Sequence, residues 1–247
     1  MASRVLIAGI GGVGGALARR LVARGIPVHL LSRSNDKLSA LSKELGGVPF
    51  TSVDVTSTDA LEAAVRDIAA QGPLHALVYA VGSIPLKPLR TTTARDFSDA
   101  FAVNFLGAAL AVKAAAPALS AGGVTRPGSV VLFSTVAAKV GFPQHAAIAA
   151  AKGAVEAYAR AAAAELSPHV RVNVVAPSLS DTPLAARFTA NEATKKAMGD
   201  AHPLPRLGTA DDSAAMAEFL IDHAQSSWIT GQVFNIDGGR STLRPKN

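Results

Sequence analysis

Short apolar runs alternate with longer amphipathic segments along the whole chain. The apolar runs are rich in Val, Leu and Ile with little apolar–polar alternation, which is typical of strands covered on both faces. This alternation predicts right-handed β–α–β crossovers and one α/β domain over residues 1–247, doubly wound, with a seven-stranded parallel sheet and helices on both faces. The expected strands are residues 4–8, 28–32, 49–53, 76–80, 129–134, 171–176 and 232–236. The expected helices are residues 14–25, 35–45, 57–71, 93–120, 143–167, 183–199 and 210–224.

Residues 178–208 differ from the rest of this pattern. The segment is rich in Pro and polar residues and follows the sixth expected strand. Segments of this kind often close over ligand sites, so we expect a mobile lid here.

Composition narrows the class of protein. Of the 247 residues, 49% are hydrophobic, but no apolar run approaches the roughly 20 residues that span a membrane. There is no Cys, which excludes disulfides and thiolate metal ligands, and we expect no metal site. We expect a cytoplasmic protein without a membrane partner. The net charge is +6 with Lys and Arg scattered, which favours a solvated basic surface over nucleic-acid binding.

A glycine-rich turn, residues 8–15 (AGIGGVGG), stands between the first strand and the first helix. Glycines let the backbone approach a pyrophosphate, and a helix N-terminus favours its negative charge. We expect Gly9, Gly12, Val13 and Gly14 to hold the pyrophosphate of a dinucleotide. The spacing can also be read as Gly9, Gly12 and Gly15.

The end of the second expected strand indicates which dinucleotide binds. An acidic residue in this region would bind the ribose hydroxyls of NAD, whereas an Arg can pair with the 2′-phosphate of NADP. This chain has Ser32 and Arg33. We therefore expect NADP(H) as the cofactor.

Residues 135–152 (TVAAKVGFPQHAAIAAAK) hold the candidate chemistry. At 3.6 residues per turn, His145, Ile148 and Lys152 share one face of the expected helix 143–167. Lys152 can stabilise a developing oxyanion, and His145 can exchange a proton near neutral pH. Ile148 can do neither.

These features and several others resemble the short-chain dehydrogenase/reductase family. The glycine turn, the VNFLG run at 103–107, the strand 129–135, Lys152 and the segments 173–182, 205–211 and 229–239 carry the resemblance. It covers nearly the whole chain. It implies a Rossmann-like fold, a nicotinamide cofactor, a small-molecule substrate and a homo-oligomer, either a tetramer or a dimer.

The resemblance also implies roles for individual residues. Asn104 would hold a water next to Lys152, which would bind the nicotinamide ribose. Thr135 would orient the substrate, with the neighbouring Ser134 as the alternative. The further cofactor contacts implied by position are Asp54 and Val55, Ala80 and Gly82, and Pro177, Ser180 and Thr182.

At one position the chain departs from the family. The proton-donating Tyr of the family lies four residues before the Lys, where this chain has Ile148. Three alternatives remain: His145 is the acid, water or a ribose hydroxyl supplies the proton, or the protein does not catalyse. The first two predict an NADP(H)-dependent oxidoreductase acting on a small carbonyl, enoyl or imine compound. The third predicts a catalytically silent NADP(H)-binding sensor or partner protein.

Overall fold

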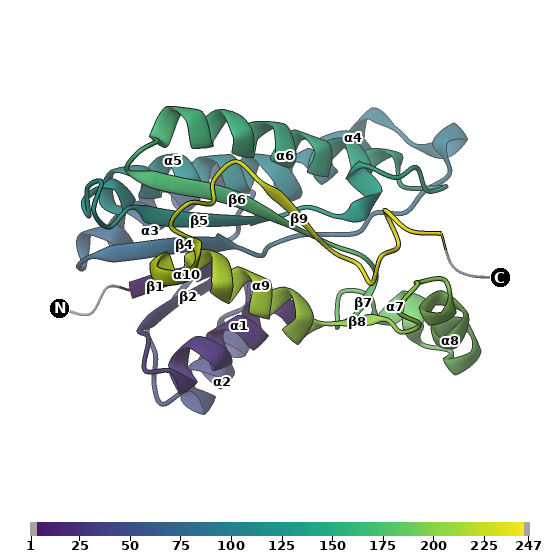
Figure 1. The fold of residues 1–247 in the computed structure, drawn as a ribbon, viewed down its shortest axis with the longest axis horizontal. Helices are drawn as coiled ribbons and strands as arrows, with labels where there is room; N and C mark the ends of the chain where they lie inside the picture. Colours follow the sequence, from purple (N-terminus) through teal and green to yellow (C-terminus); the bar gives the residue numbers. More distant parts are fainter. Residues whose placement is uncertain (1–3, 245–247) are drawn as a thin grey trace.

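The computed structural model describes residues 4–244 and contains one seven-stranded, fully parallel sheet (Figure 1). The strand order is β3-β2-β1-β4-β5-β6-β9. The predicted doubly wound fold is therefore confirmed. The strands are β1 (Arg4–Ala8), β2 (Val28–Ser32), β3 (Phe50–Ser52), β4 (Leu74–Tyr79), β5 (Gly128–Phe133), β6 (Val170–Pro177) and β9 (Val233–Ile236).

Helices cover both faces of the sheet (Figure 1). One face carries α1 (Gly12–Ala23), α2 (Asn35–Glu44) and α9 (Ala210–Ile221), with the short α10 (His223–Ser226) after α9. The other face carries α3 (Thr58–Ala70), α4 (Ala94–Phe101), α5 (Gly107–Ser120) and α6 (Ala146–Leu166).

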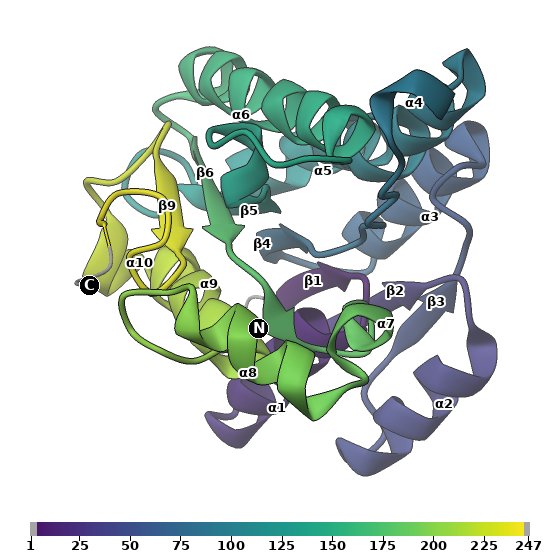
Figure 2. The same cartoon turned by 90° about the vertical axis from the view of Figure 1, so that its right-hand side faces the viewer.

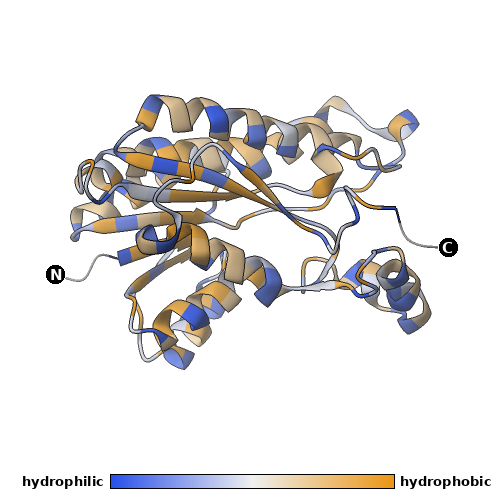
Figure 3. Ribbon diagram, in the orientation of Figure 1, coloured by the Kyte–Doolittle hydropathy of each residue, from blue (hydrophilic) through white to orange (hydrophobic). Residues whose placement is uncertain are grey.

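Each face of the sheet has its own hydrophobic core because successive side chains of a strand point to opposite faces. In β5, Val130 and Leu132 belong to the core under α3, α5 and α6, whereas Val131 and Phe133 belong to the core under α1 and α9. Figure 3 shows the same arrangement as apolar strands between helices with mixed surfaces. Burying each such side chain contributes about 1.5–3 kcal/mol.

The helix expected at 93–120 is interrupted. A π-helical turn, η2 (Ala102–Leu106), separates α4 from α5, and the Tyr79 hydroxyl donates a 3.2 Å hydrogen bond to the carbonyl of Val103 within it. Such turns are frequent at functional sites. Among residues 4–244, the run Ala94–Ser120 is the one helix that is long and apolar enough to cross a membrane, and 44% of its most apolar window is buried.

Two more expected helices differ at their boundaries. The helix expected at 143–167 begins only at Ala146, and the one expected at 183–199 is split into α7 (Ala186–Thr189) and α8 (Glu192–Asp200). A two-residue pairing of β7 (Ser180–Asp181) with β8 (Gly208–Thr209) was not predicted. Short 3₁₀ turns, η1 (Leu89–Thr91) and η3 (Val136–Ala138), complete the elements.

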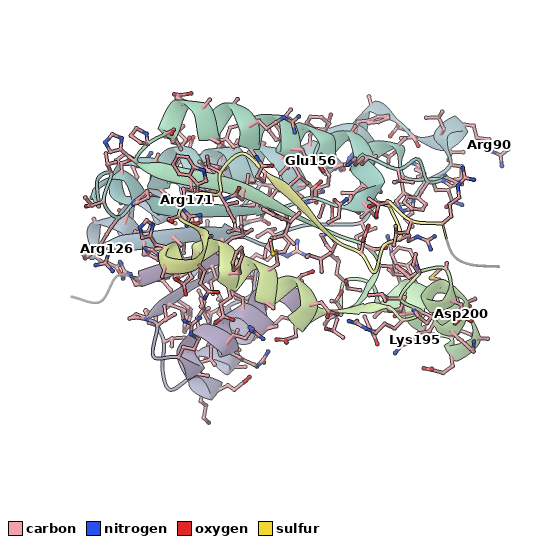
Figure 4. All side chains as sticks on the ribbon, viewed as in Figure 1. Arg90, Arg126, Glu156, Arg171, Lys195 and Asp200 are labelled. Atoms are coloured by element: carbon pink, nitrogen blue, oxygen red, sulfur yellow. The ribbon has the colours of Figure 1, made fainter. Side chains whose placement is uncertain are left out.

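The two edges of the sheet differ in construction. At the amino-terminal edge, the carbonyl oxygen of Leu220 in α9 accepts hydrogen bonds from Arg171 (2.9 Å), Ser129 (2.9 Å) and Ser226 (3.0 Å). Arg171 lies at this edge, opposite Lys195 and Asp200 of α8 (Figure 4). At the carboxyl edge, β1 and β4 are neighbours although β2 and β3 separate them in sequence, so the sheet has its switch point there. Ligands of such sheets bind outside this point.

Candidate active site and cofactor cleft

The glycine turn follows β1 at the switch point. Gly9 has φ 89°, and a Cβ there would lie 2.6 Å from the amide nitrogen of Val81 and 2.7 Å from the carbonyl carbon of Ala80. A Cβ on Gly14 would lie 1.8 Å from the carbonyl oxygen of Gly9. These two predicted glycines are therefore required by the close approach of the backbone of the turn to itself and to the end of β4.

The outer side of the same turn is open. Gly11 is the N-cap of α1 and is exposed, and no heavy atom lies within 4 Å of the position of its missing Cβ. Gly12 lies under the lid segment, since its Cβ would approach the Thr182 side chain at 2.7 Å. Val13 packs against the core of α1 and α9. The first turn of α1 thus offers its free N–H groups to an anion beside Gly11.

The residues expected to contact the adenosine part of the cofactor follow β2 and β3. Ser32 is half-buried and Arg33 is exposed. The Asp54 carboxylate accepts hydrogen bonds from the Thr56 amide (2.9 Å) and hydroxyl (2.7 Å), which lower its pKa, and the charge of Arg33 lowers it further. Val55 turns its side chain into the core, where it lies against Gly107.

Lys152 lies inside the protein at the carboxyl end of β5. Its Nζ donates a 2.8 Å hydrogen bond to the carbonyl of Phe133, and burial lowers its pKa to about 8. A Cβ on Gly82 would lie 3.6 Å from this Nζ and 3.1 Å from Oδ1 of Asn104. The fold therefore brings Gly82, Asn104 and Lys152 from three separate segments to one point.

Asn104 is buried in the π-helical turn and fixes the loop after β4. Its Oδ1 accepts from the Ser83 amide at 3.0 Å, while its Nδ2 donates to the Ser83 hydroxyl and to the carbonyl of Ala100, both at 2.9 Å. One of these hydrogen bonds is to a carbonyl of its own helix, and the other two join Asn104 to Ser83 in the loop after β4. Ala80 anchors the start of the same loop, because its amide donates a 2.7 Å hydrogen bond to the carbonyl of Ala8.

The hydroxyls of Ser134 and Thr135, which follow β5, have different hydrogen-bond partners. Ser134 is buried and donates to Oε1 of Glu156 at 2.6 Å (Glu156 is labelled in Figure 4). Thr135 caps η3 by accepting a 3.3 Å hydrogen bond from the Ala137 amide. Because the Thr135 oxygen accepts that bond, its own proton remains available for an acceptor oxygen.

His145 and Ile148 stand at the start of α6. His145 is the N-cap of α6 and its carbonyl accepts a 2.8 Å hydrogen bond from the Ala149 amide, so the predicted start of this helix at residue 143 was wrong. The helix starts late because Gln144 has φ 68°, outside helical geometry. The imidazole Nδ1 lies 2.7 Å from the carbonyl of Pro143, which leaves Nε2 for exchange of a proton. Ile148 is in the helix and only 3% exposed.

Residues 178–208, the segment expected to be a lid, follow β6. The segment leaves β6 at Pro177, and the Ser178 hydroxyl lies 2.8 Å from Nε2 of the buried His202. Ser180 joins the β7–β8 pairing, and Thr182 rests on Gly12 as described above. In Figure 2, α7 and α8 lie in front of the carboxyl ends of the strands.

Comparison with known proteins identifies this architecture. The family model described as enoyl-(acyl carrier protein) reductase matches residues 7–241. The chain belongs to the short-chain dehydrogenase/reductase family. The Xanthobacter autotrophicus protein named inactive 2-(S)-hydroxypropyl-CoM dehydrogenase 2 is 35% identical over 234 residues, 92% of this chain and 100% of that protein.

Solved structures of short-chain dehydrogenases/reductases superpose closely. A short-chain type dehydrogenase/reductase from Mycobacterium ulcerans has a TM-score of 0.89 at 33% identity, covering 99% of this chain and 92% of that one. ElxO with NADP bound has a TM-score of 0.90 at 27% identity, covering 98% and 100%. These values agree with the fold derived above.

In this short-chain dehydrogenase/reductase, three residues of the site were not predicted. Gly11 was not predicted because the spacings Gly9, Gly12, Gly14 and Gly9, Gly12, Gly15 both fit a phosphate-binding turn without it. Ser83 and Glu156 contact Asn104 and Ser134 over 21 and 22 residues of sequence, so these contacts themselves leave no local pattern. The four-residue spacing of Lys152 and Glu156 on one helix was the available signal for Glu156.

Proposed function

We propose that the protein is an NADP(H)-dependent oxidoreductase that transfers hydride between nicotinamide and a small carbonyl, enoyl or imine compound. The observation that carries the proposal is the convergence of Gly82, Asn104 and buried Lys152 beside the glycine turn, at the switch point of the sheet. The NADP bound to ElxO supports the choice of cofactor.

The residues present fit such a dinucleotide. Gly11 leaves open space in front of the α1 N-terminus, as a diphosphate requires. Lys152 uses one of its three N–H groups on Phe133 and retains the others for ribose hydroxyls. Ser32 and Arg33 would receive the 2′-phosphate, and Thr182 with Ser180 would hold the carboxamide.

The chain's own groups would act on the substrate as follows. NADP(H), when bound, supplies or accepts hydride at nicotinamide C4. Thr135 donates a hydrogen bond to the acceptor oxygen, and the Lys152 cation stabilises negative charge that develops there. The lid segment excludes water from the cleft.

The proton donor is the unusual part of the proposal. We propose that Ile148 occupies the position of the family's proton-donating Tyr, so the site lacks a phenol there. His145 Nε2 is the proposed acid, since its Nδ1 is engaged by Pro143. A general acid at this position is worth about 10²–10⁴ in rate.

A second function has one specific observation in its favour. Ile148 is buried beside Lys152 on α6, and a relative 35% identical to this chain is named as inactive. The alternative is a catalytically silent NADP(H)-binding protein. It predicts tight cofactor binding without turnover of any carbonyl, enoyl or imine compound.

The deciding experiment is calorimetric titration of NADPH and NADH into the wild type and Arg33→Ala. We expect the wild type to prefer NADPH, and Arg33→Ala to weaken NADPH about 10- to 150-fold with little effect on NADH. Arg126→Ala, an exposed Arg at the amino-terminal edge (Figure 4), is the matched control for charge. Binding of neither cofactor would overturn both functions, and binding without turnover across a broad panel would favour the silent one.

A further inference from the structure

Two contacts hold the start of the lid segment across the cleft. On one side, Thr182 packs on Gly12 of the glycine turn, with its Cγ2 2.7 Å from the position of a Gly12 Cβ. On the other side, Nη2 of Arg187 in α7 donates a hydrogen bond to the carbonyl oxygen of Ile84, in the loop after β4. The segment 182–187 therefore bridges the ends of β1 and β4.

The two ends of this bridge match the two ends of the cofactor path. Gly12 belongs to the turn that faces the diphosphate. Ile84 is two residues beyond Gly82, which meets Asn104 and Lys152 at the nicotinamide side. A dinucleotide running from the glycine turn to Lys152 would pass between these two contacts, and Arg187 would then lie at its nicotinamide side.

The charge of Arg187 has no acidic partner among residues 4–244. Its guanidinium contacts the Ile84 carbonyl and lies 4.5 Å from the centre of the Phe188 ring. The other basic residues of the segment each have an acidic partner: Lys195 pairs with Asp181, Lys196 with Asp200 and Arg206 with Asp212. A neutral carbonyl is a weaker partner for a guanidinium than a phosphate, which accepts two parallel charge-assisted bonds.

We propose that Arg187 is a cofactor-binding residue that transfers its guanidinium hydrogen bond from the Ile84 carbonyl to the nicotinamide-side phosphate of the bound dinucleotide. The inference rests on the proposed function. With Arg187 in this role, closure of the lid depends on the diphosphate and not on the 2′-phosphate, which Arg33 binds. Arg187 and Arg33 thus recognise different parts of one ligand.

Calorimetric titration of three ligands separates the two arginines. NADPH and NADH carry the diphosphate, whereas 2′,5′-ADP carries the 2′-phosphate and a single 5′-phosphate. Arg187→Ala should weaken NADPH and NADH by the same factor, about 10- to 150-fold, and leave 2′,5′-ADP unchanged. Arg33→Ala should weaken NADPH and 2′,5′-ADP and spare NADH. Arg126→Ala should change none of the three.

Hydrogen exchange gives an independent measurement on the lid. In the wild type, NADPH should slow amide exchange across residues 186–200, and in Arg187→Ala at saturating NADPH this protection should be reduced. Unchanged NADPH affinity in Arg187→Ala, or an equal loss for 2′,5′-ADP, would overturn the role of Arg187 while the proposed function stands. Failure of the wild type to bind any dinucleotide would overturn both.

Discussion

Lys152 and Phe133 are joined by a 2.8 Å hydrogen bond from the Nζ atom to the main-chain carbonyl oxygen, inside the protein. The last carbonyl of β5 thereby fixes the lysine at the point where Gly82 and Asn104 meet. Burial opposes the charged form of the side chain and lowers its pKa from 10.5 to about 8. The burial of the Lys152 side chain therefore has a consequence for the stability of the protein.

Lys152→Met tests that consequence. The folded protein releases the Lys152 proton near pH 8 and the unfolded chain near 10.5, so between these values the unfolded state binds more protons. The free energy of unfolding of the wild type should therefore rise with pH across this window, by about 3 kcal/mol relative to the Met variant. Urea denaturation from pH 7 to 11 measures the difference. Lys139→Met, at an exposed site, should follow the wild type, and parallel curves for wild type and Lys152→Met would contradict the prediction.

Gly14→Ala should damage the turn that holds the cofactor. The new Cβ would lie 1.8 Å from the carbonyl oxygen of Gly9, and backbone must move to relieve the overlap. We expect a loss of about 1–3 kcal/mol in unfolding free energy and weaker NADPH binding. Gly153→Ala is the matched control, because nothing lies within 4 Å of its Cβ position in α6 and Ala is the better helix former, by about 1 kcal/mol. If both variants behaved alike, the close packing of Gly14 against Gly9 would be of no consequence.

Gly107→Ala and Tyr79→Phe should interact. A Cβ on Gly107 would lie 2.3 Å from the Tyr79 hydroxyl oxygen, and that oxygen is what Tyr79→Phe removes. Each single change should destabilise, the first by crowding and the second by losing the bond to Val103. The unfolding free energy of the double variant should be about 0.5–3 kcal/mol higher than the sum of the single effects implies. A double-mutant cycle followed by thermal or urea denaturation measures this difference. Strict additivity would show that the crowding is relieved elsewhere.

Ile148→Tyr tests the proposed departure from the family. If the site is otherwise competent, the new phenol should raise reduction of simple carbonyl compounds by about 10²–10⁴, measured as NADPH oxidation. Ile148→Phe introduces the same ring without the hydroxyl and should give no such gain. Equal rates for the two variants, with NADPH binding intact, would mean that the cleft serves chemistry other than carbonyl reduction.

The strands could be predicted because each is an apolar run of a few residues bounded by turn-forming residues. The interruption at Ala102–Leu106 could not, since a π-helical turn leaves the apolar pattern of residues 94–120 unchanged. The late start of α6 follows from the backbone at Gln144, a residue type without a strong preference for positive φ. Many of the predicted site residues follow strand ends, where topology gathers them, whereas Asn104 and Lys152 lie on helices that pass the same point. Ser83 and Arg187 join the site only through contacts distant in sequence.

The three hydrogen bonds on the Leu220 carbonyl tie α9, β5 and β6 together at the edge of the sheet far from the cleft. This anchorage lies at the opposite end of the sheet from the segment 178–208 (Figure 4). We therefore expect that a corresponding segment from a relative, grafted between Thr182 and Leu207, would leave this anchorage intact, provided that it replaces bonds such as those of His202 with Ser178 and of Arg206 with Asp212. In an evolving lineage, this segment could therefore change in sequence while the sheet kept its anchorage.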